Sequence, residues 1–158
     1  MKTNAARLLD SLSIDYELLT YEVDLSDLSA TSTAEKLGLA ADRVFKTLVL
    51  EGDCTGVMLA VIPGSYQLDL KRIARVSGDR KVKTVALKRV RPLTGYVRGG
   101  VTALACKQVY PTFLDEWAQA CDRIAVSAGS RGQMLLLRSV DYVRATSAAI
   151  AAISQALA

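Results

Sequence analysis

The chain has 158 residues, 51% of them hydrophobic and 23% charged, with a net charge of +4 and a pI near 9.0. This composition fits one globular domain large enough to bury a core, and it excludes a disordered chain. No histidine is present, which excludes Ser-His-Asp and Cys-His catalysis and every histidine-ligated metal site. Cys54, Cys106 and Cys121 are far apart and form no Cys-x-x-Cys pair, so we expect packed side chains rather than disulfides or a thiolate metal site.

Apolar stretches are short throughout the chain. The run VMLAVI at residues 57–62 has the length of a strand and is far too short to span a bilayer. The N-terminal segment MKTNAARLLDSL lacks the long apolar stretch and the cleavage site of a secretory signal. We therefore expect a single domain over residues 1–158, no membrane contact and a cytoplasmic location.

The first elements are a helix, a strand and a second helix. Thr3 is placed to cap a short helix whose apolar face consists of Leu8, Leu9 and Leu12. Residues 15–23 predict a strand. Ser32 and Glu35 have the spacing of a capping box, and Gly38 is placed to end the helix that they begin.

A hairpin and an amphipathic helix follow. Residues 43–50 and 57–62 are apolar runs on either side of the turn EGDCTG, so they predict paired strands. The segment LDLKRIARVSG predicts a helix that ends at Gly78 and turns its basic residues outward. The residues expected to face inward are Leu70, Ile73, Ala74 and Val76.

The remainder of the chain mixes short elements. KVKTV predicts a strand, LKRVRPLTG a brief helix broken at Pro92, and GYVRGGVTALACKQ an alternation of strand and loop. RIAVSAGSRGQMLLL predicts a second hairpin, and SVDYVRATSAAIAAISQAL predicts a helical tail. Because helices and strands do not alternate strictly, we expect an α/β fold that is a single compact domain, with a mixed β-sheet flanked by helices.

Basic residues are concentrated in the segment 69–91. They are Lys71, Arg72, Arg75, Arg80, Lys81, Lys83, Lys88, Arg89 and Arg91. A stripe of this density suits a phosphate backbone as partner, although an ordinary solvated surface has the same pattern.

Lys46 does not fit its predicted strand easily. Because side chains alternate along a strand, Lys46 shares a face with the apolar residues Val44, Leu48 and Leu50. A lysine in this position either extends into solvent at a sheet edge or points into a cavity that uses its positive charge.

Glycines are clustered in LTGYVRGGV, which contains Gly95, Gly99 and Gly100. Glycines allow positive φ angles and a close approach of the backbone to a ligand. Two adjacent amides in such a loop can hold a phosphate or a developing oxyanion, although a plain turn has the same composition. No Gly-Lys-Ser/Thr follows, so the segment is not a Walker loop.

In their order and spacing these segments resemble the YbaK/EbsC family, the trans-editing domains that hydrolyse wrongly charged tRNA. The resemblance extends from TNAARLL to about residue 146. The matching segments are TYEVD (20–24), EKLGL followed by VFKTLVL (35–50), LDLKRIAR (68–75), LTGYVRGGV (93–101) and VSAGSRG (126–132).

The resemblance implies a mixed-sheet fold with one pocket for the aminoacyl end of tRNA. Lys46 matches the central functional residue of the family, so we expect it to point into the pocket and to act in catalysis. The positions that match substrate-binding residues of the family are Tyr21, Thr47, Gly99, Gly100, Thr102 and Ser127.

Two departures from the family pattern concern the pocket. The family's Gly-Gly-Val/Ile-Ser-Pro segment ends here in Thr102-Ala103, without the proline. Met134 and Leu136 stand where the cysteinyl-type editors tend to carry an Asp and a Glu. Both changes remove polarity or rigidity, so the preferred amino acid stays open.

We therefore expect an enzyme that hydrolyses mischarged aminoacyl-tRNA, with Cys-tRNA(Pro) as the first candidate, by substrate positioning and oxyanion stabilisation and with no covalent nucleophile on the enzyme. The alternatives are a deacylase for Ala-tRNA or another small-amino-acid-tRNA, and a noncatalytic module that binds tRNA or a synthetase. Mischarged tRNA and prolyl-tRNA synthetase are the expected partners, and no cofactor or metal is expected. Arg72, Arg75 and Lys81 are expected to contact the tRNA backbone.

Overall fold

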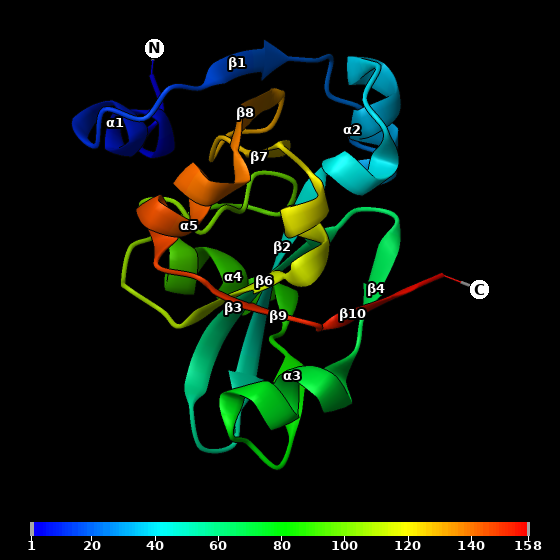
Figure 1. Cartoon of the computed structure of the whole chain (residues 1–158), viewed down its shortest axis with the longest axis vertical. Coiled ribbons are helices and arrows are strands. Elements are labelled where there is room, and N and C mark those ends of the chain that lie inside the picture. The colour runs from blue at the N-terminus through cyan, green and yellow to red at the C-terminus, as the bar shows by residue number, and fades with distance from the viewer. Residues whose placement is uncertain (1, 158) are drawn as a thin grey trace.

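The computed structural model describes residues 2–157 as a mixed α/β domain (Figure 1). The strands are β1 (Glu17–Thr20), β2 (Phe45–Gly52), β3 (Gly56–Pro63), β4 (Tyr66–Leu68), β5 (Val82–Thr84), β6 (Thr112–Asp115), β7 (Arg123–Ser127), β8 (Gln133–Arg138), β9 (Ala149–Ala151) and β10 (Ser154–Ala156). The helices are α1 (Asn4–Ser11), α2 (Ala30–Leu37), α3 (Leu70–Ser77), α4 (Leu87–Thr94) and α5 (Ser139–Thr146), with short 3-10 turns η1 (Ala41–Arg43) and η2 (Glu116–Ala120).

The main sheet has five strands in the order β5-β2-β3-β6-β9. Strands β2, β3 and β5 pair antiparallel, whereas β6 pairs parallel with β3 and with β9. A second sheet has the order β1-β8-β7, and β4 and β10 form a separate pair. The expected mixed sheet with helices is thereby confirmed, as are both predicted hairpins, β2–β3 and β7–β8.

One core lies between the two larger sheets. Phe45 and Val61 reach it from the five-stranded sheet, Ile124 and Leu135 reach it from the three-stranded sheet, and Tyr142 of α5 is fully buried in it. Burying one such side chain contributes about 1.5–3 kcal/mol. Because both sheets contribute to one cluster, neither can bury its apolar face without the other.

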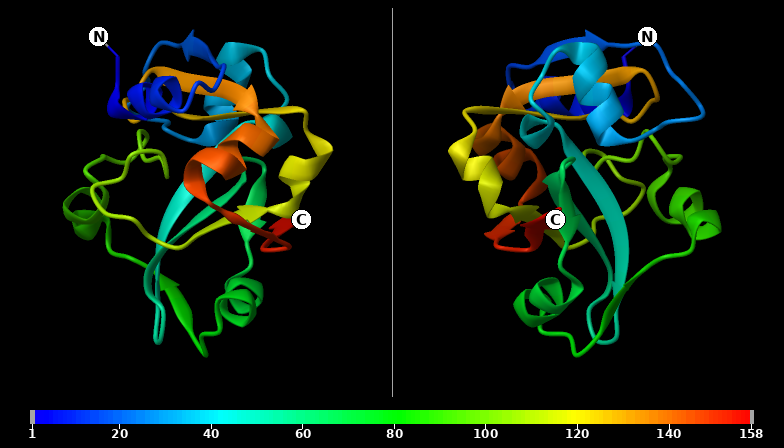
Figure 2. Two further views of the ribbon diagram at one scale, coloured as in Figure 1. Left: turned by 60° about the vertical axis from the view of Figure 1, so that its left-hand side comes forward. Right: turned by 90° about the vertical axis from the view of Figure 1, so that its right-hand side faces the viewer.

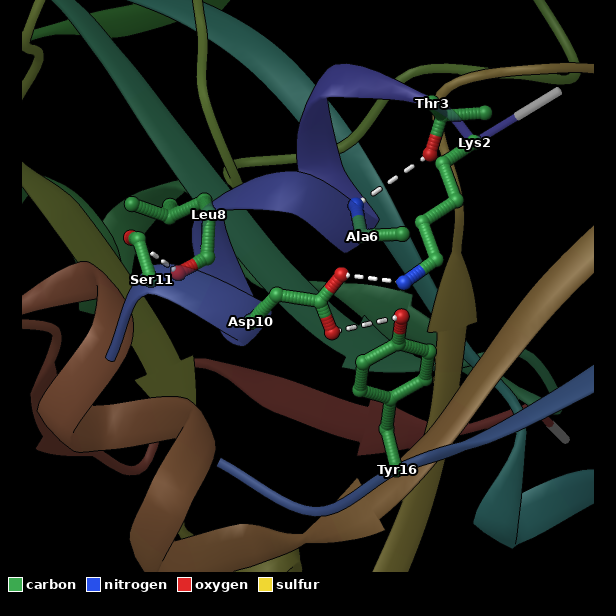
Figure 3. Close-up of polar contacts among 7 residues, drawn as sticks. All are labelled: Lys2, Thr3, Ala6, Leu8, Asp10, Ser11 and Tyr16. Carbon is green, nitrogen blue, oxygen red and sulfur yellow. Dashed lines mark hydrogen bonds and ion pairs between the residues drawn. The ribbon is translucent and has the colours of Figure 1, made fainter. Parts of the chain in front are cut away.

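Helix α1 is capped at its N-terminal end by polar contacts (Figure 3). Thr3 Oγ1 accepts a hydrogen bond from the Ala6 amide at 3.2 Å, which confirms the predicted cap. Asp10 accepts from Lys2 Nζ at 2.6 Å and from the Tyr16 hydroxyl at 3.0 Å. These bonds hold α1 against the chain that leads into β1, a strand shorter than the predicted 15–23.

The N-cap of helix α2 lies three residues before the predicted cap Ser32. The N-cap is Ser29, whose backbone is extended and whose Oγ accepts from the Ser32 amide at 3.2 Å. The prediction of Ser32 as the cap is therefore wrong, because Ser29 offers the same hydroxyl one turn earlier. Gly38 ends the helix with φ 68°, as predicted.

Helix α3 buries fewer side chains than its pattern suggested. Ile73 and Ala74 are buried and Gly78 ends the helix in the left-handed region, as predicted. Leu70 and Val76 are 42% and 44% exposed, so the prediction that they face inward is wrong. A helix of eight residues at the edge of the molecule turns only a narrow face to the core.

Three later segments differ from the sequence prediction. Helix α4 continues through Pro92 instead of breaking there. No strand occurs between Gly95 and Pro111. The predicted helical tail ends at Thr146, where Ser147 takes φ 56°, and the Ala-rich segment beyond it forms β9 and β10. Within residues 2–157, no helix has the length and hydropathy that crossing a membrane requires.

Candidate active site

Lys46 points into a cavity rather than out at an edge. It lies in β2 opposite Ile62 of β3, it lines the cavity, and its side chain is half-buried. Its Nζ donates to the carbonyl oxygen of Gly64 at 3.3 Å. Burial lowers the pKa of Lys46 from the ordinary lysine value. The described residues place no carboxylate in ion-pair contact with it, so its donors are available to a ligand.

The backbone that anchors Lys46 requires a glycine. A Cβ on Gly64 would lie 2.5 Å from Cβ of Ala30 in α2, and the Gly64 amide donates to the carbonyl of Val44 at 2.7 Å. This close approach of α2 to the end of β3 sets the carbonyl of Gly64 opposite Lys46.

The cavity has a volume of about 470 Å³ and is bounded by several parts of the chain that are far apart in sequence. Its floor is β2, and its walls are the start of α2, the segment from β5 into α4, and the loops at Gly99 and Ser127. The apolar lining residues are Leu28, Ala30, Val44, Phe45, Leu48, Val49, Val85, Leu87, Val90, Val101 and Met134. No Asp, Glu or Cys from the described part of the chain lines it.

The structure brings Tyr21, Thr47 and Ser127 to the same cavity as Lys46. The hydroxyl of Ser127 accepts from the Gly129 amide at 3.2 Å, which leaves its own proton free to donate into the cavity. Burial raises the pKa of the buried Tyr142 hydroxyl, and the nearby Thr47 side chain lowers it. The Tyr21 ring is 5.9 Å from Nζ of Lys36.

The two adjacent glycines have different environments. Gly99 lines the cavity with φ 88°, and its amide has no hydrogen-bond partner among residues 2–157. Gly100 is buried outside the lining, and its amide donates to the carbonyl of Val97 at 2.8 Å. Of the pair of amides proposed from the sequence, only that of Gly99 is available to a substrate.

The glycine loop needs small residues because it packs on the turn of the β7–β8 hairpin. A Cβ on Gly100 would lie 3.3 Å from backbone atoms of Ser130 and Arg131. Arg131 also donates from Nε to the carbonyl of Arg98 at 2.8 Å. The loop is thereby held at the edge of the cavity by contacts to the hairpin.

Three residues expected at the pocket lie behind it. Thr102 is fully buried, and its Oγ1 accepts from the Leu104 amide at 3.3 Å. Ala103 packs against the core between the sheets, and Leu136 packs in a cluster with Val44 and Ala125. Met134 alone of the departures from the family pattern lines the cavity. A direct contact of Thr102 with substrate is therefore not supported by its position.

Sequence reasoning missed several lining residues. Ser29 and Thr33 were missed because α2 begins earlier than predicted, and Leu87 and Val90 because nothing local shows that α4 lies beside β2. Arg98 lines the cavity as well, and its position directly before the two glycines was a usable signal.

The three cations expected to bind tRNA backbone do not line the cavity. Arg72 donates to the carbonyl of Ser154 at 3.2 Å and lies 3.4 Å from Asp69. Arg75 and Lys81 are exposed. Helix α3 lies near the turn of the β2–β3 hairpin, at the far end from α2 (Figure 2).

The residues best placed to hold a metal lie at that same hairpin turn. Asp53, Cys54 and Asp79 bring one potential ligand atom each within 4.8 Å of one another. Asp79, however, already accepts from the amides of Cys54 and Thr55 at 2.7 Å each and from the Ser77 hydroxyl at 2.6 Å. These bonds explain the lowered pKa of Asp79 and give it a structural use.

The cavity thus combines a lysine ammonium, a serine hydroxyl and a free amide, with no acid or thiol. Such a site can bind and polarise a carbonyl compound. Residues 28–145 match the family of aminoacyl-tRNA editing domains, and the chain belongs to that family. The resemblance drawn from the sequence is thereby confirmed.

Comparison with known proteins gives the same family. The chain is 44% identical over 136 residues to a protein of Enterococcus faecalis named "Putative Cys-tRNA(Pro)/Cys-tRNA(Cys) deacylase EbsC", covering 86% of this chain and 83% of that one. It is 27% identical over 141 residues to the Multifunctional Ser/Thr-tRNA deacylase ProXp-y of Escherichia coli, covering 87% and 83%. Its fold matches the crystal structure of hypothetical protein APE2540 with a TM-score of 0.87, at 23% identity, over 96% of this chain and 99% of that one.

Proposed function

We propose that the protein hydrolyses the ester bond of mischarged aminoacyl-tRNA, with Cys-tRNA(Pro) as its first substrate. The observation that carries the proposal is Lys46, a cation that lines the cavity and donates to the carbonyl of Gly64, in a chain 44% identical to a relative named for this activity. An editing activity is useful because a synthetase pocket separates amino acids that differ by one methylene by only about 1–3 kcal/mol.

In the proposed reaction Lys46 orients the aminoacyl ester or its terminal ribose-phosphate. The amide of Gly99 and the hydroxyl of Ser127 face the same cavity and can donate to the ester carbonyl. One preorganised donor stabilises an oxyanion by about 2.7–4 kcal/mol. Because the aminoacyl ester is already activated, its hydrolysis needs little stabilisation beyond such donors.

No protein nucleophile is required. Cys54 is exposed at the hairpin turn, and burial raises the pKa of the Cys106 thiol to about 11. Cys121 lines a different cavity. With a cysteinyl substrate, its own thiol attacks the ester carbonyl, the ribose oxygen leaves with the thiol proton, and water then opens the resulting cyclic thioester. With an alanyl substrate, a bound water takes the place of the thiol.

Met134 favours a second candidate, a deacylase for Ala-tRNA or another small-amino-acid-tRNA. It is buried, lines the cavity and lies directly across from Ser127 in the β7–β8 pairing. It therefore presents apolar surface where a polar substrate group needs a partner. A noncatalytic module that binds tRNA or a synthetase is the remaining alternative.

The test is a panel of Cys-, Ala- and Ser-tRNA(Pro), with the ester followed in the presence of the parent protein and of Lys46→Ala. Rapid loss of Cys-tRNA(Pro) with the parent supports the proposal, and preferential loss of Ala-tRNA(Pro) supports the second candidate. Binding of all three without turnover contradicts hydrolysis and supports the noncatalytic module.

We further propose that the enzyme acts in the cytoplasm together with prolyl-tRNA synthetase, which makes the mischarged product. Co-sedimentation with the synthetase, with and without tRNA, tests the association. Migration of the two proteins as separate species under both conditions would contradict the proposed association with the synthetase.

A further inference from the structure

The chain carries a long segment without a single acidic residue. No Asp or Glu occurs between Asp79 and Asp115, although this stretch contains eight lysines and arginines. The structure divides these cations between two places. Some lie near the β2–β3 turn with Lys81, and others lie on α4 and the loop after it (Figure 2).

Helix α4 forms one wall of the active-site cavity. Leu87 and Val90 line the cavity from one face of the helix, and the preceding residues Thr84 and Val85 continue that wall. Arg91 follows Leu87 by four residues and so lies one turn further along the same face. Arg91 therefore lies on the side of the helix that faces a substrate in the cavity.

One cation of α4, Arg89, has a structural partner. Arg89 makes a two-bonded pair with Glu51 of β2, at 3.1 and 3.2 Å, which fixes the helix to the sheet. Lys88 and Arg91 are exposed, and neither forms an ion pair within residues 2–157.

Two further cations extend this surface. Arg98 lines the cavity, and Lys107 meets the C-terminal end of α4, where its amide donates to the carbonyl of Thr94 at 3.0 Å. We call the exposed set Lys88, Arg91, Arg98 and Lys107 the α4 rim. None of its members is in an ion pair in the part of the chain that the structure describes.

Beside the α4 rim, the fold leaves an apolar side chain exposed to solvent. Leu87 is 61% exposed although it lies at the cavity. An exposed apolar surface beside unpaired cations suits a nucleotide, whose base packs on the apolar group while its phosphate contacts the charges.

We propose that the α4 rim binds the single-stranded 3′ end of the tRNA, with its phosphates on Lys88, Arg91, Arg98 and Lys107 and a base on Leu87. This inference rests on the proposed function, because the end of the RNA that carries the ester must reach Lys46. It replaces the sequence-based assignment of backbone contacts to Arg72, Arg75 and Lys81 with cations that adjoin the cavity.

The experiment compares two triple variants that each remove three positive charges. One is Lys88→Gln/Arg91→Gln/Lys107→Gln on the rim, and the other is Arg72→Gln/Arg75→Gln/Lys81→Gln near α3. Binding of uncharged tRNA and of a short single-stranded RNA ending in CCA is measured by fluorescence anisotropy from about 50 to about 200 mM salt. Thermal melts establish that each variant is folded.

We expect the rim variant to lose about tenfold or more in affinity for both RNAs at low salt, and its salt slope to fall by about 2, since each single-strand phosphate contact adds about 0.7. The α3 variant should bind both RNAs as the parent does. Equal losses in both variants, or a loss only in the α3 variant, would overturn the proposal.

An additional Leu87→Ala variant should weaken RNA binding without changing the salt slope, and a changed slope would contradict base packing on Leu87.

The binding assay uses no charged tRNA, so it is independent of the hydrolysis assay. If the parent hydrolyses no ester but the rim variant still loses RNA binding, the proposed function is disproved and the proposal that the rim binds RNA stands. Hydrolysis by the parent with unchanged RNA binding in the rim variant disproves the rim alone.

Discussion

At the scale of single residues, the burial of Lys46 destabilises the fold but suits the binding of a substrate. Its side chain is half-buried beside apolar residues, it donates a hydrogen bond to the carbonyl of Gly64, and burial lowers its pKa. A lysine held in this way disfavours the folded state while it is charged. Since no carboxylate among residues 2–157 pairs with it, its donors are free for substrate.

We predict that Lys46→Ala leaves the melting temperature at neutral pH equal to or above that of the parent, and lowers deacylation by at least about 10²-fold, because the ester loses the group that positions it. Lys46→Arg should not restore activity, since a planar guanidinium cannot occupy the same site. Single-turnover deacylation and thermal melts check both. Near-parental deacylation by Lys46→Ala would disprove the proposed site.

The lowered pKa also predicts a pH dependence with a definite sign. Because the neutral form of Lys46 is favoured in the folded state, the parent gains stability as the pH rises through the lowered folded pKa toward the unfolded value near 10.5. Any advantage in melting temperature of Lys46→Met over the parent should therefore shrink between neutral and strongly alkaline pH. A constant advantage would mean that the charge of Lys46 is not the cause.

Asp79 is the opposite case, a carboxylate that stabilises the fold. It closes the β2–β3 turn through the amides of Cys54 and Thr55, and these bonds with that of Ser77 lower its pKa. Because the pKa of Asp79 is lower in the folded protein than in the unfolded protein, its stabilisation is fully present above the unfolded pKa near 3.8. This stabilisation is lost as the pH falls toward the folded pKa. We predict that Asp79→Asn lowers the urea midpoint at neutral pH, and that the difference from the parent narrows in acid. An unchanged difference down to strongly acidic pH would contradict this role.

At the scale of elements, the C-terminal tail shows tertiary contacts overriding local preference. Its alanine-rich sequence favours a helix, yet β9 pairs with β6 and β10 pairs with β4. Asp115 accepts from the Ile153 amide at 3.1 Å, and Ile153 is fully buried. These partners are far away in sequence, so the local pattern contains no sign of them.

We predict that Ile153→Ala destabilises the protein by about 2–5 kcal/mol, because it leaves a cavity in the cluster beneath the five-stranded sheet. Leu157→Ala, a change at a side chain that is 60% exposed, is the control and should stay within about 0.5 kcal/mol. Urea denaturation measures both. Similar small effects for the two variants would show that the tail is not part of the cooperative core.

At the scale of the whole molecule, the shared core predicts how the protein unfolds. The three-stranded and five-stranded sheets bury one cluster between them, with Trp117 at its edge. We expect unfolding followed by Trp117 fluorescence and by far-ultraviolet circular dichroism to give one coincident transition. Separate transitions would contradict the single domain over residues 1–158.

Local chemistry was enough for the sequence to determine several features of this protein. The hairpins, the caps at Thr3 and Gly38 and the strand that carries Lys46 follow from periodicity and turn residues, and the ordered segments identified the family. Only the tertiary structure decided that α4 lines the cavity, that the amide of Gly100 is already bonded, and that the tail forms strands. These features depend on contacts between residues distant in sequence, and no local pattern specifies which distant surfaces will meet.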